Sequence, residues 1–587
     1  MFTSIRNLIA AAAIVVASLT FSSRPVLAQQ TPPAFSQIIL FGDSLSDTGN
    51  VNHRIEDITG GQIGYPSGSY NYSNGRFTNS TDTDPPARKY VGVWHEQMAR
   101  LFLNLPAATN SEDGGLNYAF GGATLENGTQ TRSIEGSPVT VTIDNIGKQI
   151  DDFLANHTFD PNALYILWGG GNDLRTDESA TNVTATANRV SVHITRLAQA
   201  GAKYILVPNV PAIGTIPQYI GNDEHAQALD VASLSYRDQL KAVIDTTVAN
   251  LAAQKINVTV YQFDEWRSNL QIYADPATYG FINVTNSAQG RSDFNPDQFV
   301  FWDDVHPTTA GHYYIAKAAY AAITGPTPSP AKAANLSTRL NVGTDQNVSI
   351  IGFIVTGDVA KKVILRGLGP SLAAKGVTGY LADPTLALYD ANNNVVASND
   401  NWEESQAVEI AATGIPPENP NESAIVATLA PGKYTAVLAG KNGGTGVGLV
   451  EAYDGDNNAS TLANLSTRGS IGIGEDVMIG GFIVGSGDNP LIVIRAIGPS
   501  LSSGGVNNPL ADPVVELHNG NGTLLRANDN WKDNPAEAQA ARSTTIQPTD
   551  DHESAITAFL PSGNYTAVVR GANNTIGVAS VEIYRLR

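Results

Sequence analysis

Three loops of this chain carry residues that together could perform acyl transfer. Ser44 and Asn172 each follow a short apolar run, and Asp303 precedes His306 by three residues. A serine needs an adjacent base to become a nucleophile, and a histidine can be that base near neutral pH. A carboxylate on the same turn as the histidine can hold the imidazole in one tautomer. These residue types therefore predict serine-based acyl transfer.

Acyl transfer also needs donors for the oxyanion that forms on the carbonyl. Gly121 and Gly122 permit a tight turn whose backbone N–H groups face outward, and the amide of Asn172 is a second source of donors. The residues alone leave open which of the two glycines donates. Asp43 is interpreted as a residue that holds the turn around Ser44.

Each of these features also has a structural explanation, and the sequence lacks the motifs of several other chemistries. A Gly-Asp-Ser turn at 42–44 is common in loops, and His193 within a predicted helix is interpreted as structural. His95-Glu96 lacks the second histidine of a zinc protease helix, and no GxSxG or phosphate-binding loop occurs. With no cysteine in the chain, a thiol nucleophile and a thiolate metal site are excluded.

The elements that would position these loops alternate between strand and helix. Alternation over 37–323 predicts a parallel sheet covered by helices on both faces. The predicted strands are 38–41, 116–119, 164–168, 204–207 and 257–261, and the predicted helices are 93–103, 143–156, 185–200, 232–254 and 309–322. Serines that follow such strands lie where open α/β sheets bind their ligands.

A polar segment at 54–90 is too long for a simple connection, which is typical of functional or disordered loops. Its residues Tyr70, Tyr72 and Phe77 could line a pocket, or the segment could be a solvated lid with no role.

Four blocks in one order resemble the GDSL, or SGNH, hydrolase superfamily, in its lipase-like esterase branch. They are FGDSLSDTGN at 41–50, NYAFGGAT at 117–124, WGGGNDL at 168–174 and DDVHPT at 303–308. The resemblance covers about residues 37–323. NGRFTN at 74–79 is also similar to the lipase-like branch, although the insertion before Trp94 departs from its usual spacing and leaves the shape of the substrate pocket open.

The resemblance implies a role for each matching residue. Ser44 would be the nucleophile, His306 the base and Asp303 its orienting acid, with DxxH spacing selecting Asp303 over Asp304. The oxyanion donors would be the Ser44 N–H, Gly122 and Asn172. The family fold implied is a three-layer α/β/α, flavodoxin-like domain at 35–323, with no metal and no cofactor.

Composition and the N-terminus indicate export. The chain has 35 Lys and Arg against 55 Asp and Glu, a net charge of −20, which argues against nucleic acid and anionic membrane surfaces as partners. Residues 1–28 are typical of a signal peptide, with Arg6, an apolar core at 8–19 and a cleavage site near Ala28. We therefore expect a secreted or otherwise extracytoplasmic protein.

The second half of the chain repeats itself after a Pro-rich linker at 324–333. ANLSTR at 334–339 recurs at 463–468 and NDNW at 399–402 recurs at 528–531, both with an offset of 129 residues. Short strand-like runs between Gly, Asn and Pro turns predict two β-rich, sandwich-like modules at 334–456 and 463–587. These modules resemble no family to which a role could be assigned.

Two features of the repeats have open interpretations. Trp402 and Trp531 could be exposed platforms for a sugar ring, but matched tryptophans in a duplicated module favour core positions. The Asn-Asp clusters could hold Ca²⁺ or could simply form turns.

The sequence as a whole predicts a secreted serine hydrolase that cleaves carboxylic esters, an esterase or lipase. One alternative is a phospholipase or acyltransferase of the same superfamily. Another is a surface or glycan-binding protein whose repeats carry the main function. Acyl length, the alcohol part and the oligomeric state do not follow from the sequence.

Overall fold

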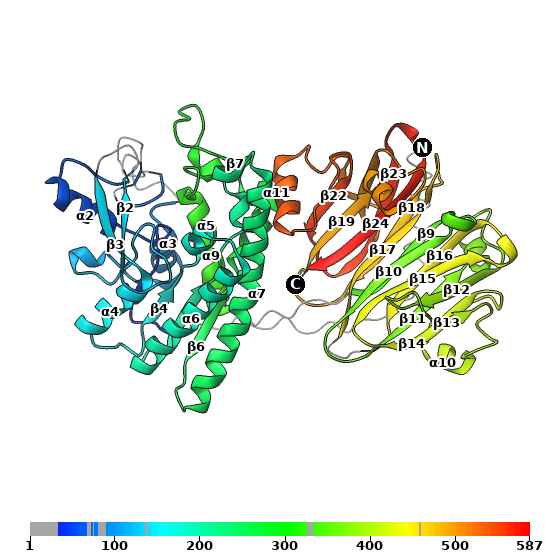
Figure 1. The fold of residues 1–587 in the computed structure, drawn as a ribbon, viewed down its shortest axis with the longest axis horizontal. Helices are drawn as coiled ribbons and strands as arrows, with labels where there is room; N and C mark the ends of the chain where they lie inside the picture. Colours follow the sequence, from blue (N-terminus) through cyan, green and yellow to red (C-terminus); the bar gives the residue numbers. More distant parts are fainter. Residues whose placement is uncertain are drawn as a thin grey trace. The chain divides into compact units, whose positions relative to one another are not determined.

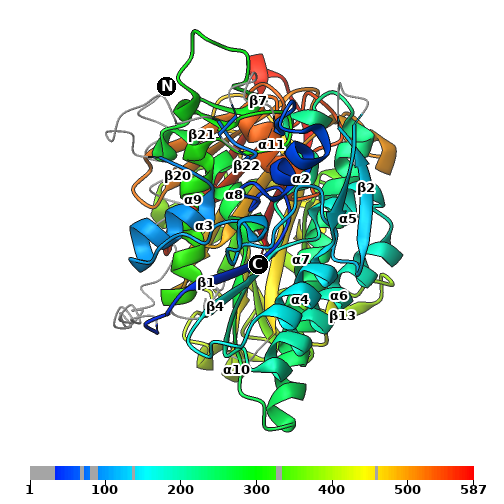
Figure 2. The same cartoon turned by 90° about the vertical axis from the view of Figure 1, so that its left-hand side faces the viewer.

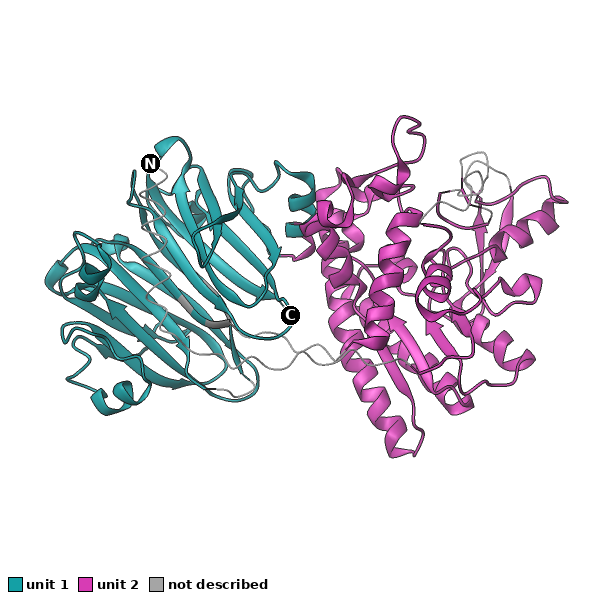
Figure 3. Ribbon diagram, turned by 180° about the vertical axis from the view of Figure 1, so that it is seen from behind, with its two compact units in different colours: residues 1–26, 327–541, 546–587 teal, residues 27–326, 542–545 magenta. Residues whose placement is uncertain are grey.

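The structure, a computed structural model, describes residues 33–66, 72–73, 75–79, 90–134, 139–325, 333–456 and 460–586. The chain divides into two compact units (Figure 3): an N-terminal unit formed mainly by residues 27–326, and a C-terminal unit formed by residues 327–541 and 546–587. The predicted signal peptide at 1–28 and most of the predicted linker lie outside the described residues. Among the described residues, no helix has the length and apolar character needed to cross a membrane.

The N-terminal unit is built on the predicted parallel sheet. Its strand order is β1-β4-β5-β6, and all three pairings are parallel. The strands are β1 (Ile38–Phe41), β4 (Leu164–Leu167), β5 (Tyr204–Pro208) and β6 (Thr259–Phe263). The predicted strand at 116–119 is not a regular strand, but it runs along β1 through Leu40 N–H to Leu116 O at 3.0 Å and Tyr118 N–H to Leu40 O at 2.8 Å. With that segment counted, the order is flavodoxin-like.

Helices cover both faces of this sheet (Figures 1 and 2). Alternate side chains of a strand point to opposite faces, so Leu40 and Phe41 face different layers. On one face Leu40 belongs to a buried cluster with Trp94 of α3 (Trp94–Met98) and Ala319 of α9 (Thr309–Thr324). On the other face Phe41 packs on Phe153 of α4 (Ile146–Asn156), with ring centroids 5.6 Å apart. The expected α/β fold is confirmed for this unit.

Several bounds differ from those predicted. The helix expected at 93–103 continues after α3 as the π-helix η2 (Ala99–Leu103), and Ile143, expected in α4, belongs to a strand. The other predicted helices are α6 (Ala180–Ala200) and α7 (Asp223–Ala253). Elements without a sequence prediction are α2 (Asn50–Thr59), the hairpin β2 (Thr129–Ser133) and β3 (Thr140–Asp144), α5 (Gly171–Thr176), α8 (Glu265–Ala274), β7 (Asn283–Ser287) and β8 (Phe299–Phe301).

The C-terminal unit is β-rich, and every pairing between its strands is antiparallel. The first copy of the repeat holds β9 (Ala333–Val342), β10 (Ser349–Thr356), β11 (Lys361–Leu368), β12 (Pro384–Tyr389), β13 (Val395–Asn399), α10 (Ala407–Ala412), β14 (Ser423–Leu429), β15 (Gly432–Gly440) and β16 (Gly446–Asp454). The second copy holds β17 (Thr461–Ile471), β18 (Met478–Val484), β19 (Leu491–Ile497), β20 (Pro513–Asn519), β21 (Leu524–Asn528), α11 (Pro535–Ser543), β22 (Ser554–Phe559), β23 (Gly563–Gly571) and β24 (Gly577–Leu586). The two copies have the same element order.

The two copies share strand pairings instead of forming separate sheets. β10 of the first copy pairs with β17 of the second, and β9 pairs with β18. Thr338 and Thr467, which the repeat offset relates, share a hydrogen bond between their hydroxyls at 2.7 Å. One buried cluster includes Phe353 of the first copy and Phe482 of the second. The two separate modules expected from the sequence are therefore not confirmed as independent, because their edges and core are joined.

The matched tryptophans pack in equivalent small clusters. Trp402 is half-buried beside Ile410 and Ala424, and Trp531 is buried beside Ala541 and Ala555. Neither indole is a flat exposed platform, which favours the core interpretation.

Candidate active site

Ser44 lies on a tight turn at the carboxyl end of β1. Gln149 of α4 holds the backbone of Gly42 by accepting its N–H and donating to its carbonyl, each at 2.9 Å. The carboxylate of Asp43 accepts the Leu45 N–H at 3.1 Å, and the Asp43 carbonyl accepts the N–H groups of Ser46 and Asp47. Burial raises the pKa of Asp43 to about 6. Asp43 therefore holds the turn, as expected, and Ser44 stays partly exposed.

Asp47 joins the serine turn to the glycine turn. Its buried carboxylate accepts the N–H groups of Gly49 and Asn50 at 2.8 Å each, and the N–H of Gly121 at 2.9 Å. Asn117 adds a second link, because its amide donates to the Ser46 carbonyl at 2.8 Å. Hydrogen bonds thus connect the motif at 41–50 to the motif at 117–124. The sequence did not predict that Asp47 would make this connection.

Ser44, His306 and Asp303 form a continuous chain of hydrogen bonds across 262 residues of sequence. The Nε2 atom of His306 lies 2.8 Å from Ser44 Oγ, and its Nδ1 lies 2.8 Å from Asp303 Oδ2. Because an ionised carboxylate can only accept, the proton sits on Nδ1 and Nε2 is left as the acceptor for the serine hydroxyl. The predicted Asp303 is the partner of His306.

The carboxylate of Asp303 accepts three further hydrogen bonds besides the one from His306 Nδ1. Its Oδ1 accepts the backbone N–H groups of Val305 at 2.7 Å and His306 at 2.6 Å, and its Oδ2 accepts the hydroxyl of Tyr72 at 2.7 Å. Burial raises the pKa of Asp303, but the charge and hydrogen bonds of His306 and the Val305 N–H outweigh it and lower the pKa to about 2. Asp303 is therefore ionised at neutral pH.

The polar segment that precedes α3 reaches the histidine. The Phe77 ring packs on the imidazole of His306, with centroids 4.9 Å apart, and Thr78 donates its hydroxyl to the Pro307 carbonyl at 2.9 Å. A Cβ on Gly121 would lie 2.5 Å from the Phe77 ring, so only glycine leaves room there. Tyr72 and Phe77 thus contact the residues around the site, while Tyr70 lies outside the described residues.

The glycine turn has one N–H in use and one free. The Gly121 N–H is taken by Asp47, whereas the N–H groups of Gly122 and Ser44 have no acceptor among the described residues. Gly122 has a φ of +86°, a conformation that glycine adopts without strain. The Asn172 amide at the start of α5 donates to the Ala123 carbonyl at 3.0 Å, which places it beside the same turn.

The remaining candidate residues do not take part in the hydrogen bonds that link Ser44, His306 and Asp303. Asp304 makes no side-chain contact with His306 among the described residues, and only its carbonyl is used, by Gln218. His193 is buried in α6 with Nε2 2.8 Å from the Leu125 carbonyl, a structural position. In the described part of the chain, no three His, Cys, Asp or Glu residues gather as metal ligands would.

A serine, a histidine and an aspartate linked in this way at the edge of a parallel α/β sheet are typical of serine ester hydrolases. Residues 38–319 match the family model of the GDSL-like lipases and acylhydrolases, so this part of the chain is a domain of that family. The family match does not extend to the C-terminal unit.

Curated relatives align with the same half of the chain. A phosphatidylcholine-sterol acyltransferase of Aeromonas hydrophila is 26% identical over 50% of this chain and 92% of its own length. A GDSL esterase/lipase of Arabidopsis thaliana is 28% identical over 52% of this chain and 91% of its own. Lipase 1 of Photorhabdus luminescens is 24% identical over 50% and 51%, respectively. Among solved structures, the match to an acetyl xylan esterase has 12% identity, covers 49% of this chain and 98% of that chain, and has a TM-score of 0.25.

Proposed function

We propose that this protein is an exported serine hydrolase that cleaves carboxylic esters through an acyl-enzyme on Ser44. The observation that carries the proposal is the hydrogen-bonded chain from Ser44 through His306 to Asp303 within a GDSL-like domain. Export rests on the signal-peptide pattern of residues 1–28.

In the proposed reaction, Ser44 Oγ attacks the ester carbonyl while its proton passes to His306 Nε2. Asp303 stabilises the imidazolium that forms. The N–H groups of Ser44 and Gly122 and the amide of Asn172 donate to the oxyanion. His306 then protonates the leaving alcohol. A water molecule next attacks the acyl carbon while its proton passes to His306, and His306 returns this proton to Ser44 Oγ as the bond to the acid breaks. No metal or cofactor takes part in these steps.

The direct test is turnover of p-nitrophenyl esters from acetate to long acyl chains, combined with fluorophosphonate labelling and mapping of the modified peptide. We expect turnover and a label on Ser44, and the chain-length profile will separate an esterase from a lipase. Adding a sterol or other alcohol to the assay tests the acyltransferase alternative, which the Aeromonas relative's name suggests. No turnover together with no label on Ser44 would contradict the proposal.

Replacing Asn172 by alanine is expected to lower kcat by about 100- to 1,000-fold, because one oxyanion donor is lost and donors of this kind contribute about 3 to 4 kcal/mol to the barrier. KM should change little, since the donor acts mainly when charge develops. The control is Asn182→Ala, at the start of α6, whose amide donates to the carbonyls of Asp173 in α5 and of Asp177 just after it. If both variants lose activity equally, Asn172 acts on local structure only.

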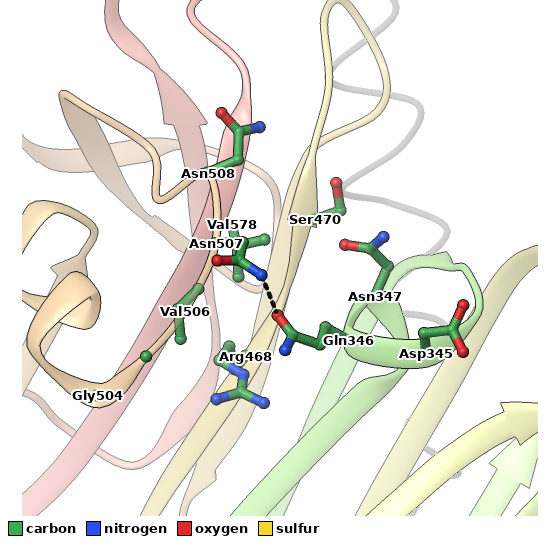
Figure 4. A pocket seen from close by; sticks show the side chains of 11 residues that line it. Asp345, Gln346, Asn347, Arg468, Ser470, Gly504, Val506, Asn507, Asn508 and Val578 are labelled. Carbon is green, nitrogen blue, oxygen red and sulfur yellow. Dashed lines mark hydrogen bonds between the residues drawn. The ribbon is translucent and has the colours of Figure 1, made fainter.

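For the C-terminal unit we propose contact with a glycan. A pocket of about 560 Å³ lies where the two copies meet (Figure 4). It is lined by amides of both copies, with Asn507 donating to Gln346 at 3.3 Å, and by the guanidinium of Arg468. Amides both donate and accept, as hydroxyl-rich sugars require.

This second proposal predicts that the full chain is retarded in gels that contain a soluble polysaccharide, and that Arg468→Ala weakens the retardation by about 10-fold, the equivalent of one charge-assisted hydrogen bond. Lys433→Ala, an exposed cation of the same unit outside the pocket, is the control. If wild type and Arg468→Ala are retarded equally on neutral and acidic polysaccharides, the pocket does not bind the glycan.

A further inference from the structure

Tyr72 brings a hydrogen bond to Asp303 from outside the turn that carries this carboxylate. The Tyr72 hydroxyl lies 2.7 Å from Asp303 Oδ2, the oxygen that also faces His306 Nδ1 at 2.8 Å. The other oxygen, Oδ1, accepts the backbone N–H groups of Val305 and His306 and lies 3.1 Å from His306 Nδ1. The backbone of the turn thus holds one oxygen of the carboxylate, and Tyr72 contacts the other.

The Tyr72 hydroxyl donates its proton to Asp303. An ionised carboxylate can only accept, whereas the side chain of Gln289, which also hydrogen-bonds the hydroxyl, can donate an amide N–H to it. Burial and the negative charge of Asp303 raise the pKa of Tyr72, so the hydroxyl keeps its proton when Asp303 is ionised. One ordered series of hydrogen bonds therefore runs through five side chains: Gln289, Tyr72, Asp303, His306 and Ser44.

The neighbours of Tyr72 hold its ring in place. The ring meets that of Trp302, the residue before Asp303, edge to face, with centroids 6.2 Å apart. The backbone of Tyr72 forms an antiparallel bridge with Asn79, whose Oδ1 accepts the N–H of Thr309 at 2.7 Å. Tyr72 is thus tied to the chain both before and after the catalytic histidine.

An ion pair anchors the same stretch of chain to α3. Arg76 binds Glu96 with two hydrogen bonds, from Nε to Oε2 at 2.8 Å and from Nη2 to Oε1 at 2.7 Å. A bidentate pair of this kind fixes geometry as well as contributing energy. Glu96 is buried and also accepts the Val93 N–H at 3.0 Å. The described residues 72–73 and 75–79 therefore hold Tyr72 in a fixed position against Asp303.

We propose that Tyr72 is a positioning residue for the catalytic base: its hydroxyl holds Asp303 Oδ2 in line with His306 Nδ1. The inference rests on the proposed ester hydrolysis and adds a residue to its machinery. With only Oδ1 held by the backbone, the carboxylate would turn more freely about its Cβ–Cγ bond, because rotation about this bond has a broad energy minimum. By fixing Oδ2, Tyr72 keeps the imidazole in the tautomer that accepts the serine proton.

The test is the kinetics of Tyr72→Phe, which removes the hydroxyl and keeps the ring beside Trp302. With a p-nitrophenyl ester we expect kcat to fall about 10-fold, equal to about 1.4 kcal/mol in the barrier. KM should change little, because the hydroxyl acts on the base and not on the ester. The matched control is Tyr314→Phe, on α9, whose hydroxyl donates to the Tyr279 carbonyl at 2.6 Å. This control should keep the kcat of wild type.

A double-variant cycle separates positioning from support of the fold. If Tyr72 acts through Asp303, Tyr72→Phe should have little further effect once Asp303→Asn is present, because the amide nitrogen cannot accept the hydroxyl proton. An equal loss in the wild-type and Asp303→Asn backgrounds would mean that Tyr72 only supports the local structure, and the inference would be wrong. A loss confined to KM, or a kcat for Tyr72→Phe within about 2-fold of wild type, would also overturn it.

A measurement that needs no turnover keeps this inference separate from the proposed hydrolysis. The proton that His306 Nδ1 shares with a carboxylate should give a far-downfield proton NMR signal, which Asp303→Asn removes. In the full chain we expect Tyr72→Phe to shift this signal and Tyr314→Phe to leave it unchanged. A signal that is absent from wild type or unmoved in Tyr72→Phe overturns the role of Tyr72. A shifted signal in a protein that cleaves no ester and takes no label on Ser44 counts against the hydrolase alone.

Discussion

Replacing Ser44 by alanine is expected to lower kcat for p-nitrophenyl esters by about 10,000- to 1,000,000-fold, leaving only the residual catalysis of the oxyanion donors. The reason is that Ser44 Oγ is the atom 2.8 Å from His306 Nε2, and alanine has no atom that could form the acyl bond. Activity is measured with enzyme concentrations high enough to detect the residual rate.

When residues act together in catalysis, the losses of kcat caused by replacing them do not add up. This gives a second test of the role of Ser44. His306→Ala should cost about as much as Ser44→Ala, and the double variant should be little worse than either single variant. Ser36→Ala is the control, because its hydroxyl contacts Asp160 at the far end of β1. If the double variant instead lost the product of the two single effects, the two side chains would act independently and the acyl-enzyme mechanism would not hold.

The sequence predicted the central pairing of the site because its residues stand in short local patterns. Ser44 follows a buried strand, and the DxxH spacing puts Asp303 and His306 on one turn, where Oδ1 of Asp303 can accept the N–H of residues two and three positions later. Such contacts depend on local geometry, which a motif carries. The order of alternating strands and helices likewise predicted the sheet.

Contacts between distant segments could not be predicted in this way. Tyr72 reaches Asp303 across 231 residues, and no local pattern indicates which hydroxyl will meet the carboxylate. The hairpin that carries Arg132 has the sequence TQTRS, whose polar residues alternate without the apolar face that marks a strand. The hydrogen bond from Arg132 Nη2 to the Gly122 carbonyl, 2.7 Å long, is therefore visible only in the structure.

The strand pairing between the two repeat copies could not be predicted from the sequence either. The offset of 129 residues reveals the duplication, yet it does not indicate that β9 pairs both with β16 of its own copy and with β18 of the other copy. Both pairings satisfy the same alternation of side chains, because the two copies have nearly the same strands. The exchange between copies explains why a pocket lined by residues of both copies exists in this unit.

Replacing Asp303 by asparagine is expected to lower kcat by about 10,000-fold while leaving the fold of the loop intact. The asparagine Oδ1 can still accept the N–H groups of Val305 and His306, so the turn keeps its hydrogen bonds. An amide nitrogen, however, would replace the Oδ2 that faces His306 Nδ1 at 2.8 Å. Since an amide N–H can only donate, Nδ1 must then accept, and the proton moves to Nε2.

In that tautomer, Nε2 can no longer accept the proton of Ser44, so the serine loses its base even though every heavy atom keeps its place. Asp304→Asn is the matched control: the same change one residue later, on a side chain that does not contact His306 in the described part of the chain. Activity is compared at saturating ester, and thermal unfolding of both variants checks that the fold survives. A large loss in Asp304→Asn with little loss in Asp303→Asn would show that Asp304, and not Asp303, orients His306. A large loss in Asp303→Asn alone would tie catalysis to the tautomer of His306.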